Sequence, residues 1–188
     1  MLDSDSNYLL TQQQLESDEV NKFSSSMILS DEAKKFAIAR EVQRSITQPH
    51  LMVGAITSVF TLLTYNTARV LNRKLGLFRQ PPLIRGIMYL GLLPTMMLSY
   101  VLIKDAYNRM AERDLERRTS SISSEYAKGG VEYYEKMLQR NIALRELVGP
   151  GGKDQYTGTG DLVQGIIRIK RVSLQEKKDL CRSYAATY

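Results

Sequence analysis

The sequence predicts a mainly α-helical protein, with a hairpin of two transmembrane helices, flanking amphipathic helices and a small helical C-terminal domain. The first observation is a pair of uncharged apolar stretches, 51–68 and 86–103. Each would form a helix about 27 Å long, close to the ~30 Å hydrocarbon core of a bilayer. The second observation is the helical spacing of apolar residues on both sides of this pair. We expect four parts: an acidic tail (1–28), an amphipathic helix (29–48), the hairpin (49–104) and the C-terminal domain (105–188).

Composition restricts the chemistry available to the chain. Its 188 residues include one cysteine, Cys181, and one histidine, His50, and the formal charge is +6. A single cysteine excludes an internal disulfide, and one Cys with one His cannot make a structural Cys/His zinc site in one chain. His50 lies at the start of an apolar stretch, which favours a role at the membrane interface. The glycine-rich segment 149–161 lacks the residue order of a phosphate-binding loop. We therefore expect no metal, no cofactor and no small-molecule substrate.

The first 28 residues are polar and acidic. No Lys or Arg precedes Lys22, which is the opposite of a mitochondrial presequence, and no secretory signal pattern is present. We expect this tail to be largely disordered. Targeting would then depend on the apolar spans and the basic loop between them.

Ser30 is the predicted N-cap of the amphipathic helix. Asp31 and Glu32 follow in the first turn, where the helix dipole favours acids. Apolar residues recur near helical spacing and predict the buried face. These residues are Phe36, Ala39, Val42 and Ile46.

The centre of this helix has the spacing of a zinc-protease helix, H-E-x-x-H, with arginine at both ligand positions. The residues are Arg40, Glu41 and Arg44. Arginine keeps its proton and offers no lone pair to a metal, so peptidase chemistry should be absent. Two structural interpretations remain open. The three residues form an exposed surface pair worth about 0.3 kcal/mol, or a buried ion network that joins two helical blocks.

The two spans differ in polarity. The second has Tyr89 and Tyr100 near its ends, where aromatic rings favour the membrane interface, and Pro94 inside it, which should kink the helix. The first has a face of small and hydroxyl side chains, which permits close helix approach in lipid. We expect this face to pack on the second span or on a partner's helix. It consists of Gly54, Thr57, Ser58, Thr61 and Tyr65.

A basic loop, 69–85, joins the spans and contains no acid. Its cations are Arg69, Arg73, Lys74, Arg79 and Arg85. Nucleic-acid binding is one interpretation of such a cluster. The apolar stretches on both sides favour membrane flanking instead, so we expect a bilayer and not a nucleic acid as the partner.

Two helices are expected at the start of the C-terminal domain. The first covers 104–127, and Gly129-Gly130 should end it. The second covers about 131–147 and buries Tyr134, Leu138 and Ile142. Glu132 and Lys136 are expected to pair on its exposed face, while Asn141 beside the apolar line needs a specific hydrogen-bond partner.

The remaining residues divide into a loop, a short strand and a last helix. Gly149 to Gly152 should end the second helix, and 152–161 should be loop. The segment 165–172 is a candidate strand. Ser173 and Glu176 form a capping box for a final helix to about Tyr184.

Two blocks of the sequence resemble one protein family. The segments LSDEAKKFAIAREV (29–42) and ERRTSSISSEYAKGGVEYYEKMLQRNIALRELVG (116–149) resemble transmembrane protein 177, as do YTGTGDLV and RIKR further on. The resemblance implies an animal mitochondrial inner-membrane, multi-pass protein. It also implies a role in cytochrome c oxidase biogenesis, in the complex that stabilises newly made subunit 2 with its chaperone and copper-delivery proteins. Family members have a longer N-terminal region with a further hydrophobic segment where this chain has a short acidic start.

A second resemblance is to membrane zinc metallopeptidases of the prenyl-protease type. The order is Arg40-Glu41-x-x-Arg44, two spans, then Glu112 or Glu116 in the position of a third ligand. Such a scaffold could keep a substrate-holding groove without the metal.

These observations predict a non-catalytic assembly factor or scaffold, a pseudo-peptidase that binds proteins. The alternatives are a structural supernumerary subunit of a larger membrane complex, and a hydrolase with an unrecognised site. Arg117-Arg118 is expected to be a solvated helix face or a lipid-phosphate contact. The candidate residues for partner binding or structural motifs are Arg40, Glu41, Arg44, Arg117, Arg118, Gly129, Gly130, Glu132, Tyr134, Glu135, Asn141 and Arg145.

Overall fold

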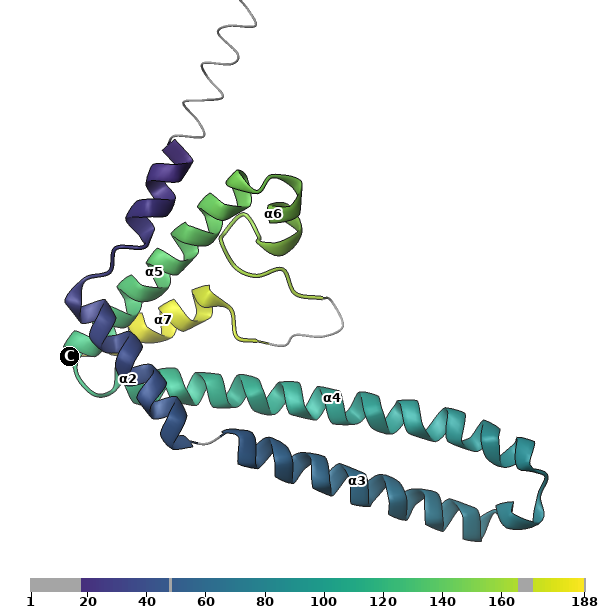
Figure 1. Ribbon diagram of the computed structural model, residues 1–188. Helices are drawn as coiled ribbons and strands as arrows, with labels where there is room; N and C mark the ends of the chain where they lie inside the picture. The colour runs from purple at the N-terminus through teal and green to yellow at the C-terminus, as the bar shows by residue number, and fades with distance from the viewer. Residues whose placement is uncertain (1–17, 48, 166–170, 188) are drawn as a thin grey trace, which may run out of the picture. The chain divides into compact units, whose positions relative to one another are not determined.

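The computed structural model describes residues 18–47, 49–165 and 171–187, and these residues are mainly helical (Figure 1). The helices are α2 (Asp31–Thr47), α3 (Pro49–Lys74), α4 (Pro82–Ser120), α5 (Ser124–Leu147), α6 (Pro150–Gln155) and α7 (Leu174–Ala185), with a short 3₁₀ turn, η1 (Leu77–Arg79). Within these ranges the β structure is limited to one bridge, between Tyr156 and Leu162. The helices α3 and α4 are long and apolar enough to cross a membrane, which confirms the predicted fold class.

The chain forms two compact units. One, which we call the hairpin unit, is Thr47–Ala111. The other, which we call the helical unit, combines the residues up to Ile46 with those from Glu112 onward. The first part of α4 belongs to the hairpin unit, and its last turns belong to the helical unit.

The hairpin unit consists of α3, a tight turn and the first part of α4. Gly76 has φ 61°, a left-handed conformation that glycine adopts without strain, and η1 follows it with Leu77 buried. Asn72 is buried and donates from Nδ2 to the Tyr89 hydroxyl at 2.8 Å. The turn is shorter than the predicted loop 69–85, because α3 continues to Lys74 and α4 starts at Pro82.

The face of small and hydroxyl side chains on α3 is mostly exposed. Thr57 reaches Tyr100, with 3.0 Å between the two hydroxyl oxygens, but Gly54, Ser58 and Thr61 are exposed. The hydroxyls of Ser58 and Thr61 donate to carbonyls four residues earlier on α3 itself. Their hydrogen bonds are therefore satisfied without a second helix. Thr57 thus contacts the second span, and for Gly54, Ser58 and Thr61 the expectation of packing on the second span or on a partner's helix stays a prediction.

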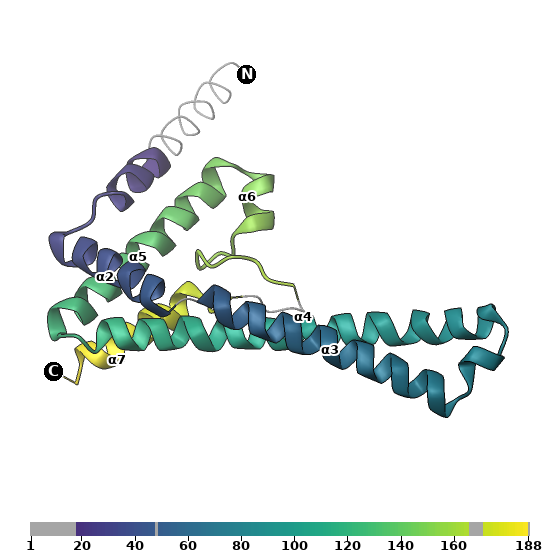
Figure 2. The same ribbon diagram turned by 60° about the horizontal axis from the view of Figure 1, so that its bottom comes forward.

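The helical unit is built around α5, with α7 alongside it in both ribbon views (Figures 1 and 2). Phe36, Tyr134 and Cys181 form its buried cluster, which brings α2, α5 and α7 together. The Oγ of Ser123 caps α5 by accepting from Tyr126 N–H, so the break after α4 falls at 121–123. The predicted break at Gly129-Gly130 was wrong, since α5 runs through both glycines.

At the ends of the helical unit, the structure agrees in part with the predictions from the sequence. Ser30 Oγ accepts from Ala33 N–H and Ser173 Oγ accepts from Glu176 N–H, which confirms both serines as N-caps. The Glu176 half of the predicted capping box is not formed, because Glu176 Oε1 accepts from Arg113 Nε. Residues 18–26 are helical, contrary to the expected disorder of the tail, and residues 1–17 lie outside the described part. Most of the candidate strand 165–172 also lies outside it.

The expected loop 152–161 is helical in its first four residues. Residues 150–155 form α6 because Pro150 occupies the first turn, where its missing N–H costs nothing. Gly149, with φ 67°, separates α6 from α5.

Candidate interaction surface

The position of α2 depends on two glycines of α5. A Cβ added to Gly129 would lie 2.4 Å from the Glu32 carbonyl oxygen, which is backbone and cannot rotate away. A Cβ added to Gly130 would lie 2.8 Å from the Phe36 ring and 2.9 Å from Cys181 Sγ. The glycines therefore let α2 approach α5 closely. In sequence a glycine pair is typical of a helix break, and close tertiary packing has overridden that preference here.

Aromatic packing completes this contact. Phe36 is fully buried, and its ring centroid is 5.9 Å from those of both Tyr133 and Tyr134. The ring of Tyr134 meets that of Phe36 edge-on, an arrangement that aromatic pairs favour. The prediction that Tyr134 belongs to the core is confirmed.

A buried ion pair holds α2 against the last turns of α4. Arg40 donates from Nε to Glu116 Oε1 at 2.8 Å, and the two side chains are 11% and 0% exposed. Burial opposes the charge on Arg40, but the neighbouring Tyr134 and Glu116 more than offset it, so the net direction of the Arg40 pKa is upward. Arg40 thus remains a cation in a nearly dry environment.

The two other residues of the motif lie outside this buried pair. The side chains of Glu41 and Arg44 are 58% and 52% exposed, and Arg44 Nη1 lies 3.6 Å from Glu41 Oε2. Arg40 also donates from Nη1 to Glu41 Oε1 at 2.6 Å. Both alternatives left open by the sequence are therefore partly right. Arg40 belongs to a buried pair, and Glu41 with Arg44 forms a surface pair.

Further polar groups surround the buried pair. Ser120 Oγ donates to Cys181 Sγ at 3.3 Å, and burial raises the pKa of the Cys181 thiol to about 12. Glu116 Oε2 and the Tyr134 hydroxyl are also buried beside the pair. No local sequence pattern predicts the contact between Ser120 and Cys181, because the two residues are 61 positions apart along the chain.

The metallopeptidase arrangement is not reproduced. Glu116 contacts Arg40, and Glu112 pairs with Lys177 at 3.0 Å and accepts from Val172 N–H. In the described ranges no three His, Cys, Asp or Glu side chains form a metal-binding group. Both acids in the third-ligand position are instead ion-pair partners of cations.

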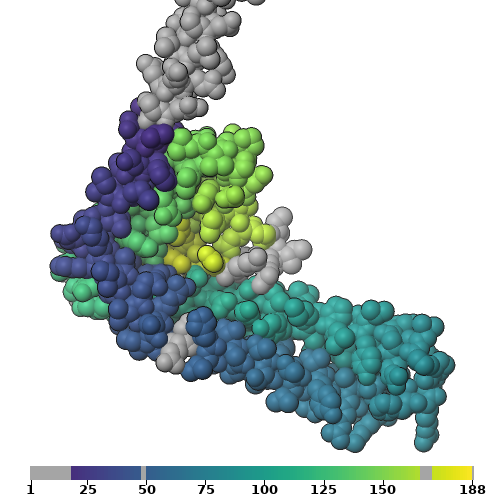
Figure 3. Space-filling model, in the orientation of Figure 1, coloured from purple at the N-terminus to yellow at the C-terminus, as the bar shows by residue number. Residues whose placement is uncertain are grey.

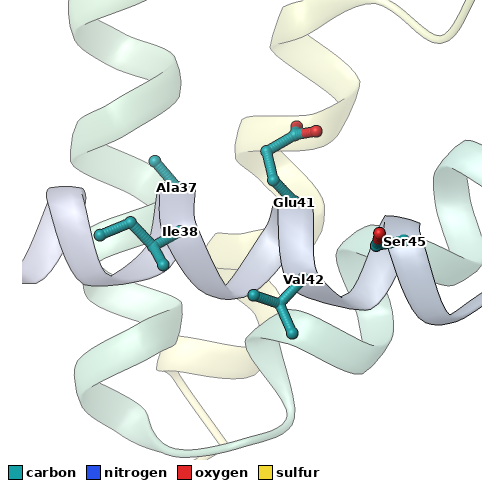
Figure 4. Close-up of a pocket in the computed structure, with 5 residues that line it drawn as sticks. All are labelled: Ala37, Ile38, Glu41, Val42 and Ser45. Carbon is teal, nitrogen blue, oxygen red and sulfur yellow. The ribbon is translucent and has the colours of Figure 1, made fainter.

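The outward face of α2 is an exposed apolar ridge. Ile38, Val42 and Ile46 are spaced by one helical turn and are 66%, 52% and 68% exposed. Ala37, Ile38, Glu41, Val42 and Ser45 line an open, nearly flat area on this part of α2 (Figure 4). We call Ile38, Val42 and Ile46 the α2 ridge. In the space-filling view the N-terminal helices form one flank of the unit (Figure 3).

The sequence prediction of which α2 residues are buried was therefore only partly right. Phe36 is buried as expected, but Val42 and Ile46 are exposed. The buried face instead passes through Ala33, Phe36 and Arg40, and the Arg40 guanidinium pairs there with the buried Glu116.

The remaining candidate residues on α5 fix neighbouring segments. Glu132 accepts from the N–H and hydroxyl of Ser30, while Lys136 donates to the Ser25 carbonyl. Their predicted mutual pair is therefore replaced by two contacts with the segment before α2. Asn141 donates to the Gly160 carbonyl at 2.8 Å, which confirms that it has a specific partner.

Other candidates lie at the surface. Glu135, Arg117 and Arg118 are exposed, and Arg118 pairs with Asp114 at 2.7 Å. Arg145 pairs with its neighbour Glu146. Ile142, expected in the core, is 37% exposed. The buried position in that turn belongs to Ala143.

Comparison with known proteins agrees with this helical, membrane-spanning architecture. The family model for transmembrane protein 177 matches residues 11–180. Transmembrane protein 177 of Homo sapiens is 36% identical over 82% of this chain, and that of Danio rerio is 33% identical over 82%. An uncharacterized protein of Caenorhabditis elegans is 26% identical over 78% of the chain.

The match has a limited extent in the relatives. The chain spans about half of the human and zebrafish proteins, 50% in each case. No solved structure matches the chain. The family match over nearly the whole chain, with the two apolar helices α3 and α4, shows that this protein belongs to the transmembrane protein 177 family.

Proposed function

We propose that this protein is a non-catalytic scaffold of the mitochondrial inner membrane that stabilises newly made cytochrome c oxidase subunit 2 together with its chaperone. Family membership supports this role, since the resemblance in 29–42 and 116–149 implies it. Because the chain spans half of its relatives, the role is proposed for this half as the part that docks on the client.

The observation behind the proposal is the α2 ridge. Its three branched apolar side chains are exposed and point away from the buried cluster of Phe36, Tyr134 and Cys181. The Arg40–Glu116 pair and the ring of Phe36 hold α2 from the other side, so the ridge is a preformed surface. Preformed apolar surfaces lose little conformational entropy on binding and favour protein partners.

The charge on α2 supports a scaffold over a peptidase. Arg40 and Arg44 occupy the two positions where a zinc helix has its ligands, and both are cations at neutral pH. A divalent metal there would be repelled, and Glu41 would have no metal-activated water to deprotonate.

The test is to change the α2 ridge and follow subunit 2. We expect Ile38→Glu with Val42→Glu to reduce co-purification of newly made subunit 2 at least fivefold and to shorten its lifetime in a pulse-chase experiment. The matched control is Val148→Glu with Val163→Glu, which adds the same charges at apolar positions of comparable exposure. The control should bind as the unchanged protein does.

Two results would contradict the proposal. One is an unchanged lifetime of subunit 2 when the protein is deleted. The other is migration with mature oxidase on native gels instead of with assembly intermediates, which is the behaviour of a structural supernumerary subunit.

A further inference from the structure

The turn of the hairpin unit concentrates positive charge that has no acid to neutralise it. Five cations, which we call the tip cations, lie at or beside the turn: Arg69, Arg73, Lys74, Arg79 and Arg85. No Asp or Glu occurs between Val42 and Lys104. The hairpin unit contains a single acid, Asp105, which is buried. It lies 20 residues beyond Arg85 on α4, or about 30 Å along the helix.

The turn fixes these cations at one level along the hairpin. Arg69 and Arg85 immediately border the two uncharged stretches, and Gly76 reverses the chain between them. Asn72 and Tyr89 tie the two helices together just below the turn through their 2.8 Å hydrogen bond. When the stretches span a bilayer, the tip cations therefore lie at the depth of the lipid headgroups.

Apolar groups accompany the tip cations. Phe78 is 70% exposed and Leu75 is 56% exposed, while the guanidinium of Arg85 lies 5.9 Å from the centre of the Phe78 ring. Exposed aromatic and apolar side chains beside cations are typical of a surface that inserts between acyl chains and binds phosphates above them.

We propose that the hairpin tip binds the phosphate groups of anionic phospholipids, and so gathers these lipids around the protein in one leaflet. Each cation near a membrane surface favours anionic lipid by a several-fold factor, and arginine binds phosphate oxygens with two parallel donors. The occupant is a bilayer lipid, because α3 and α4 place the tip in the headgroup layer. The inference is independent of the proposed role with subunit 2.

The absence of tryptophan from the chain permits a direct test. In the variant Phe78→Trp, the new indole reports the lipids that touch the tip. The protein is reconstituted in phosphatidylcholine vesicles with 10% brominated phosphatidylglycerol, or with 10% brominated phosphatidylcholine. We expect about two- to fivefold stronger quenching by the anionic lipid in 50 mM salt, and most of this preference should be lost in 500 mM salt.

A matched pair of variants separates the tip from the rest of the hairpin. Arg69→Gln with Arg73→Gln should reduce the preference for the anionic lipid by at least half. Lys104→Gln with Arg109→Gln removes the same charge about 30 Å away along α4 and should leave it unchanged. Equal quenching by both lipids, or equal effects of the two pairs, would overturn the proposal. Loss of the preference on adding 10 mM inorganic phosphate would also overturn it, since that result indicates a site for a soluble anion.

Discussion

At the scale of single residues, Arg40 and Glu116 illustrate how a charged pair can position a surface. A buried pair contributes little net stability relative to apolar residues of similar size, but loss of one partner leaves the other charge buried and unpaired. In this protein the pair lies on the same buried side of α2 as Ala33 and Phe36, while Ile38, Val42 and Ile46 are exposed.

Substitution of one partner should therefore be more harmful than substitution of both. We expect Arg40→Met to lower the free energy of unfolding by about 3–5 kcal/mol, and Arg40→Met with Glu116→Leu to recover most of that loss. Denaturant unfolding in detergent, followed by circular dichroism, measures both variants. A double variant no more stable than the single one would indicate that the pair contributes through geometry that apolar residues cannot replace.

At the scale of elements, the contact between α2 and α5 depends on the absence of two side chains. In an ordinary helix, replacement of glycine by alanine adds stability of about 1 kcal/mol. At Gly129 the same change brings a methyl group within 2.4 Å of the Glu32 carbonyl, so the helices must separate.

We expect Gly129→Ala to destabilise the protein by about 1–3 kcal/mol in thermal unfolding. Gly86→Ala is the matched control, because Gly86 lies within α4 and a Cβ there meets nothing within 4 Å. The control should be neutral or slightly stabilising. Equal behaviour of the two variants would show that α2 does not need this close approach.

The sequence predicted elements better than contacts, for physical reasons. Caps such as Ser30 and Ser173 act on residues three positions away, so a local pattern identifies them. The role of Gly129-Gly130 depends on Glu32 and Phe36, which are distant in sequence, and no local signal distinguishes close packing from a helix break. The long-range contacts of the candidate interaction surface were missed for the same reason. Arg40 was recognised, but its partner is 76 residues away.

At the scale of the whole molecule, the outward faces of α3 and α4 are apolar and exposed. The most exposed side chains there include Leu51, Val59, Leu90 and Met97. Long helices with such exposed apolar side chains are stable in lipid and tend to aggregate in water.

The protein should therefore stay with the membrane pellet after extraction with alkaline carbonate, which releases proteins held only by surface contacts. Protease-protection of intact and opened membrane vesicles provides a second readout. We expect sites in 18–47 and in 121–187 to become cleavable under the same condition. Release into the supernatant by carbonate would contradict the two-span architecture.

The composition of the helical unit has a consequence for biogenesis. It joins the residues before α3 to those after α4, so both flanks must reach the same aqueous compartment before it can fold. In the described part of the chain, the segment between the two spans and its cations must then cross the bilayer. Folding of the helical unit would therefore indicate that both spans are already inserted.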